Sequence, residues 1–139
     1  MKNSNSVANQ DTEMALRKIL SVRGYSLSRP RTNGELGVDL VAIKGNENIQ
    51  VEIIGYKKSG PTRARDFFEV FFRILSRLGG EGSSFVIALP KAWSEGLRRR
   101  ATVYYREAWR RLSVAFPEVE IWLVDASSVE KTLLKDWVE

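Results

Sequence analysis

Two acidic residues lie within apolar segments of the sequence, and their carboxylates are candidates for a chemical role. Asp39 lies in LGVDLVAI and Glu52 lies in IQVEII, and the five residues KGNEN separate these segments. Alternating β-branched runs joined by glycine and asparagine are typical of a β-hairpin. Counting pairs across a turn of this length places residue 39 opposite or diagonal to residues 52 and 53. We therefore expect the two carboxylates to converge if both leave the same face of the sheet.

Neighbouring carboxylates repel each other unless one is protonated or a cation lies between them. Mg²⁺ and Mn²⁺ take oxygen ligands and need no histidine or cysteine. The sequence contains neither residue type, which excludes thiol nucleophiles, Cys/His zinc sites and imidazole acid–base catalysis. A hard cation between Asp39 and Glu52 would activate a water molecule and stabilise charge on a phosphodiester. The alternative is that both acids are solvated on an exposed face of the hairpin.

A third acid lies in the first predicted helix, which runs from about residue 10 to 23 and ends before Gly24. Glu13 precedes Leu16 and Leu20 by three and seven residues, so it shares their inward side. Alternatively it lies at the margin of the apolar stripe, where a carboxylate complements the helix dipole. Residues 1–10 are expected to be a flexible lead-in.

Hydrophobic periodicity predicts the remaining elements. A helix from about 61 to 78 with a wide phenylalanine-rich face precedes the buried strand SSFVIALP. A long helix over 94–115, the strand VEIWLVD and a closing helix in SSVEKTLLKDWVE follow, the last with Ser127 and Glu130 at capping-box spacing. This order predicts a single three-layer α/β domain over residues 1–139 with a mixed sheet. The wide face over Phe67–Leu78 also suggests a homodimer contact.

The charge balance permits a polyanionic partner. The 139 residues include 22 Lys+Arg and 17 Asp+Glu, a net charge of +5, which permits binding to nucleic acid. The candidate phosphate contacts in the loop entering the second helix are Lys57, Lys58, Arg63 and Arg65. A second group, Arg99, Arg106 and Arg110, forms a stripe on the long helix and is alternatively its solvated side. No apolar run is long enough to span a membrane, and a cytoplasmic location is expected.

Glu13 on a first helix, then GVDLVAIKGNENIQVEIIGYK, a helix and SSFVIALP resemble the PD-(D/E)XK nuclease superfamily, over about residues 11–90. The similarity is greatest to its Holliday-junction resolvase-like and Mrr-like branches. It implies a restriction-endonuclease-like αβββαβ core and a DNA substrate. Carried over by position, Glu13, Asp39 and Glu52 would be the three metal-binding acids, which hold Mg²⁺ or Mn²⁺ and activate the attacking water.

One position departs from this resemblance. The lysine of the E-x-K motif would stand at position 54, where the sequence has Ile54. Lys57, just past the strand, is the expected catalytic replacement because its side chain is long and flexible. Its odd offset from Ile54 puts it on the other strand face unless Gly55 introduces a bend. The expectation is therefore a metal-dependent DNA endonuclease, and the alternative is a catalytically degenerate nuclease-fold protein that serves as a DNA-binding or protein-assembly module.

Overall fold

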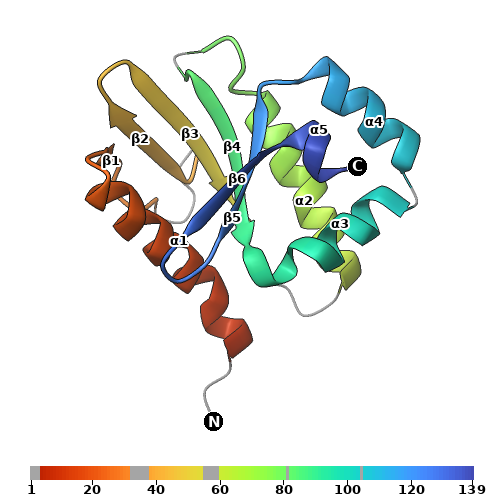
Figure 1. Cartoon of the computed structure of the whole chain (residues 1–139), viewed down its shortest axis with the longest axis horizontal. Coiled ribbons are helices and arrows are strands. Elements are labelled where there is room, and N and C mark those ends of the chain that lie inside the picture. Colours follow the sequence, from red (N-terminus) through yellow and green to blue (C-terminus); the bar gives the residue numbers. More distant parts are fainter. Residues whose placement is uncertain (1–3, 32–37, 55–59, 81, 104) are drawn as a thin grey trace.

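The computed structural model describes residues 4–31, 38–54, 60–80, 82–103 and 105–139, without the side chains of 4–11 and 60–63. A mixed six-stranded sheet lies between helices on its two faces (Figure 1). The predicted α/β class with a mixed sheet is confirmed. Within the described ranges, no helix has both the length and the apolar character needed to cross a membrane.

The strands lie side by side in the order in which they occur in the chain. They are β1 (Ser26–Leu27), β2 (Leu40–Lys44), β3 (Glu47–Ile53), β4 (Ser84–Pro90), β5 (Val119–Val124) and β6 (Val129–Leu133). The first three form an antiparallel meander, β4 and β5 continue the sheet parallel to β3, and β6 returns antiparallel to β5. Parallel neighbours need crossover connections, and helices supply both of them.

The β2–β3 hairpin is confirmed, but its turn is shorter than the predicted five residues. Lys44 pairs with Glu47, so only Gly45 and Asn46 connect the strands. Gly45 has φ of 58°, in the left-handed region that glycine enters at least cost and that two-residue hairpin turns require. This turn fixes the register of every pair in the hairpin, including Leu40 with Val51.

Helix α1 (Ser4–Val22) covers one face of the sheet. It begins six residues before the predicted start, inside the stretch expected to be a lead-in. Leu16 and Leu20 are fully buried against a sheet face that includes Leu40 and Val51. The helix ends at Gly24, whose φ of 92° lets the following amide donate to the carbonyl of Leu20 at 3.0 Å.

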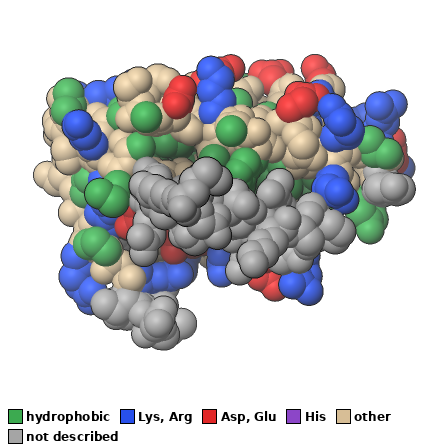
Figure 2. All heavy atoms as spheres, turned by 90° about the horizontal axis from the view of Figure 1, so that it is seen from below, with side chains coloured by type: hydrophobic (Ala, Val, Ile, Leu, Met, Phe, Trp, Pro, Cys, Tyr) green, Lys and Arg blue, Asp and Glu red, His purple; other side chains and the backbone are tan. Residues whose placement is uncertain are grey.

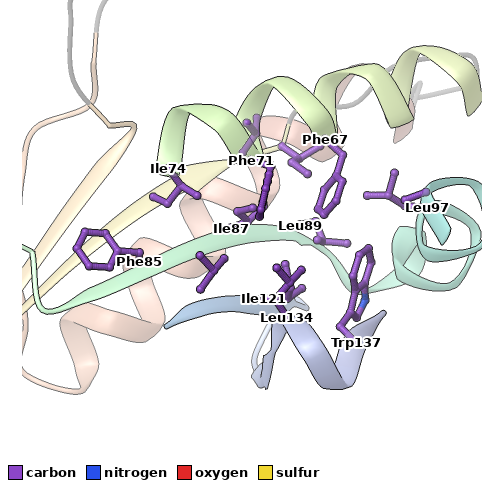
Figure 3. Close-up of a cluster of buried hydrophobic side chains, with 14 of the residues drawn as sticks. Phe67, Phe71, Ile74, Phe85, Ile87, Leu89, Leu97, Ile121, Leu134 and Trp137 are labelled. Carbon is purple, nitrogen blue, oxygen red and sulfur yellow. The ribbon is translucent and has the colours of Figure 1, made fainter. Parts of the chain in front are cut away.

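The other face is covered by α2 (Gly60–Leu75), α3 (Ser94–Val103), α4 (Arg106–Ala115) and α5 (Leu134–Trp137). Figure 3 shows the side chains that α2 directs toward β4, with Leu97 of α3 and Trp137 of α5 at one end of the cluster. The indole nitrogen of Trp137 also donates a hydrogen bond to Ser94 Oγ at 2.9 Å. The last helix of the described chain is therefore fastened to the start of α3.

The wide apolar face of α2 has partners within the same chain. Phe67 and Phe71 are buried against Trp109 of α4, with ring centroids 5.2 and 5.0 Å apart. Phe68, which widens the stripe, stacks on the same tryptophan at 5.8 Å. Only Phe72 is largely exposed among the phenylalanines of α2, at 65%. The sheet and α4 thus cover most of the wide apolar face of α2 that suggested a homodimer contact. The homodimer itself stays a prediction.

The predicted single helix over 94–115 is wrong, because α3 and α4 are separate helices. The chain leaves helical geometry at Tyr105, which has φ of −128° and ψ of 33°. Two β-branched residues, Thr102 and Val103, end α3 and weaken helix propensity there. The change of direction allows both Ala101 of α3 and Trp109 of α4 to be buried in the same cluster.

The predicted closing helix is also largely wrong. Residues Val129–Leu133 form the edge strand β6, and only Leu134–Trp137 are helical. The capping-box spacing of Ser127 and Glu130 is a local signal, whereas β5 offers a whole edge of hydrogen-bonding groups to the returning chain. Pairing with β5 therefore overrides the helical pattern.

Candidate acidic site

Asp39 immediately precedes β2, and Glu52 lies on the neighbouring strand β3 of the hairpin. The register pairs Leu40 with Val51, so continuing it by one residue places Asp39 beside Glu52. Val51 and Ile53 are buried on the α1 side of the sheet, which directs Glu52 to the α2 side. Asp39 Oδ2 accepts a hydrogen bond from the amide of Ile53 at 2.8 Å. The structure therefore brings these two acids together.

Glu52 is a buried carboxylate whose oxygens accept no hydrogen bond from the described residues. Its side chain is 0% exposed, and among the described residues neither of its oxygens has a hydrogen-bond partner. Arg73 Nε of α2 lies 3.2 Å from Glu52 Oε2, but not in hydrogen-bond geometry, so their attraction is electrostatic. Burial and the charge of Asp39 raise the pKa of Glu52 from 4.5 to about 7, against the opposing effect of Arg73. Such perturbed groups cluster at functional sites.

Arginines that sequence reasoning missed neutralise this pair. Arg31 Nη2 lies 3.0 Å from Asp39 Oδ1, and Arg31, Arg73 and Arg77 all favour the charged form of Glu52. One weak signal was present for Arg73, which lies three residues after the buried Val70 and hence at the edge of the buried helix stripe. Nothing in the sequence indicates which strand that edge meets.

Glu13 lies apart from the pair. Its carboxylate Oε2 is 2.9 Å from Arg17 Nε, one helical turn later on α1, and Arg17 also donates to the carbonyl of Ser28 at 2.6 Å. The helix covers the face of the sheet opposite to the one Glu52 points to. Among the described residues no group of three acids could hold a metal ion, so the structure does not bring Glu13 into a cluster with Asp39 and Glu52.

The position of the motif lysine is part of the core. Ile54 is 0% exposed, packs in the cluster beneath α2, and donates its amide to the carbonyl of Ala88 at 2.9 Å. The predicted replacement Lys57 and its neighbour Lys58 lie outside the described residues. The side chain of Arg63 is likewise not described, whereas Arg65 is exposed on α2.

Basic and acidic side chains both lie on the face in Figure 2, which carries Lys and Arg at both its ends, together with Asp and Glu. Among the described residues some charges are neutralised in ion pairs, as in the pair that Arg110 forms with Glu107. Local clusters therefore carry more information about ligands than the net charge of +5 does.

Comparison with known proteins adds no family assignment. No family model matches the chain, and neither a curated protein nor a solved structure is significantly similar to it. The chemistry of Asp39, Glu52 and their arginine partners is therefore the basis for a functional proposal.

Proposed function

We propose that the protein is a metal-dependent endonuclease-like protein that acts on DNA phosphodiesters. The observation that carries this proposal is the adjacency of Asp39, which immediately precedes β2, and the buried Glu52 of β3. The element order α1-β1-β2-β3-α2-β4 supports it, because the resemblance to PD-(D/E)XK nucleases implies this order. The restriction-endonuclease-like core and its activity are part of the proposal.

The chemistry of the pair suits a divalent cation. Mg²⁺ is usually bound through one or two carboxylates, with waters and substrate phosphates completing its shell. Glu52 offers two oxygens that accept no hydrogen bond among the described residues, and a cation would relieve its repulsion with Asp39. Arg31 and Arg73 stabilise the same charges, so cation binding would compete with these ion pairs.

Each residue then has a definite task. A bound Mg²⁺ or Mn²⁺ supplies an activated water and stabilises charge on the phosphodiester. Asp39 is oriented by the amide of Ile53. Glu52 is ionised above its pKa of about 7, and in that form it would serve as a metal ligand. Arg31 and Arg73, released from the acids, are suited to contact phosphate oxygens.

A cleavage assay on linear and branched DNA tests the proposal. We expect Mg²⁺- or Mn²⁺-dependent cutting that increases from pH 6 to 8, and a loss of at least about 100-fold in Asp39→Asn. The control Asp136→Asn makes the same charge change at an exposed position of α5 and should keep full activity. Equal cutting by both variants would contradict the assignment of Asp39.

Metal binding is measured separately from cleavage. A cation that binds only the folded protein raises its thermal midpoint, so Mn²⁺ at pH 8 should stabilise the wild type and the Asp136→Asn control. Asp39→Asn should lose most of this stabilisation. If Mn²⁺ stabilises all three proteins equally, the cation binds elsewhere.

The second candidate function is DNA binding without cleavage. It is favoured by Ile54, which occupies the lysine position as a core residue, and by the arginines paired with Glu13, Asp39 and Glu52. This function predicts salt-dependent DNA binding and no cutting in either metal. The cleavage and thermal assays together separate the two functions.

A further inference from the structure

A basic pocket lies among α3, α4 and α5, and none of its lining residues belongs to the acidic site. Its volume is about 360 Å³, within the range of small-molecule pockets. Four cationic side chains and one carboxylate contribute to its wall. They are Arg98, Arg106, Arg110, Lys135 and Glu139.

Among the described residues, two of the four cations have ion-pair partners and two do not. Arg98 pairs with Glu95, and Arg110 pairs with Glu107. Within the described part of the chain, Arg106 and Lys135 have no ion-pair partner. The pocket therefore has an excess of positive charge, and Arg106 and Lys135 can bind an anion.

The rest of the wall determines what else the anion can carry. Val114 and Val138 add apolar surface. Thr102 and Ser113 also line the pocket, and each donates its hydroxyl to a carbonyl of its own helix, at 2.7 and 2.9 Å. Their oxygens remain as acceptors for a ligand N–H. The complementary ligand has an anionic group for guanidinium and ammonium donors, a flat or apolar portion, and an N–H donor.

We propose that this pocket binds the phosphate ester of a nucleotide, either as a free nucleotide or within a single strand of nucleic acid. Guanidinium groups match phosphate geometry with paired N–H donors, and the base supplies the flat portion and the N–H groups. The pocket needs neither a metal nor the acidic pair. It therefore stands or fails independently of the proposed nuclease function.

The test uses AMP and a short fluorescein-labelled single-stranded DNA in EDTA, so that no cleavage occurs. The double variant Arg106→Gln/Lys135→Gln removes the two unpaired cations. The control Arg100→Gln/Lys18→Gln removes the same charge at exposed positions outside the pocket. We expect the pocket variant to bind both probes at least about tenfold more weakly, and to lower the slope of log K against log salt for DNA by about 1.4.

A variant that keeps every charge distinguishes binding in the pocket from a general electrostatic attraction between the probes and the protein. Val114 is 69% exposed, so Val114→Trp can fill the pocket mouth without disturbing the core, and it should weaken both probes severalfold. Displacement of DNA by AMP at similar concentrations identifies a free nucleotide as the ligand, and displacement only at much higher AMP concentrations identifies a strand. The proposal is overturned if neither probe binds, if the control variant loses as much affinity as the pocket variant, or if Val114→Trp binds like the wild type.

Discussion

Ile54→Lys is expected to destabilise the fold by about 3 kcal/mol or more. Ile54 is fully buried beneath α2, and its backbone is held to β4 by a hydrogen bond to Ala88. A lysine there loses apolar contacts and must either desolvate its ammonium group or deprotonate. Glu52 lies two residues earlier on the same strand face, but an ion pair between two buried charges offsets only part of their desolvation.

Urea denaturation at pH 7 measures this effect. The matched variant Ile54→Met keeps an apolar side chain of similar volume and should cost less than about 1.5 kcal/mol. If Ile54→Lys is as stable as the wild type and also gains metal-dependent cutting, the prediction is wrong and position 54 accepts the motif lysine. If the variant unfolds, the core around position 54 does not accept a lysine side chain.

Glu52→Gln is expected to make the protein more stable than the wild type above pH 7, and the stability difference should vanish or reverse toward pH 4.5. Glu52 has a folded-state pKa of about 7, above its ordinary value of 4.5. Between these values the folded state holds the proton more tightly than the unfolded state, so stability falls as pH rises. The pKa difference between about 7 and 4.5 corresponds, at about 1.4 kcal/mol per tenfold change in acidity, to a loss of about 3–4 kcal/mol by the wild type relative to the glutamine variant.

The difference between two urea denaturation curves across pH isolates this group, because other titrating residues contribute equally to both proteins. Glu69→Gln, an exposed substitution on α2, serves as the control for the loss of one carboxylate. A pH-independent difference for Glu52→Gln would contradict the raised pKa of Glu52. Mg²⁺ or Mn²⁺ bound at the pair should reduce the wild-type loss, since a cation lowers the pKa of a carboxylate ligand.

The sheet was largely predictable from sequence because its signals are local. Alternation around Asp39 and Glu52 marks the hairpin, and the unbroken apolar run of SSFVIALP marks the central strand β4. The two failures both involve contacts between distant parts of the chain. At Tyr105 the burial of Trp109 against α2 adds to weak helix propensity at Thr102 and Val103. The edge strand Val129–Leu133 pairs with β5, which overrides a local helix pattern.

The candidate site was predictable only in part for the same reason. Counting across the hairpin is enough to bring Asp39 near Glu52, since Asp39 immediately precedes β2 and Glu52 lies on the adjacent strand β3. The partners that neutralise them come from elsewhere, Arg31 from the segment after β1 and Arg73 from α2. Glu13 was assigned by its place on α1, but a helical wheel does not indicate which face of the sheet the helix will cover.

The break between α3 and α4 places Arg98 and Arg106 on two separate helices. The basic pocket is therefore lined by both helices, and its shape depends on the change of chain direction at Tyr105. A change that straightens this corner would remove the pocket while leaving the β2–β3 hairpin untouched. Substitutions that alter this pocket can therefore arise in evolution without altering the acids in the sheet.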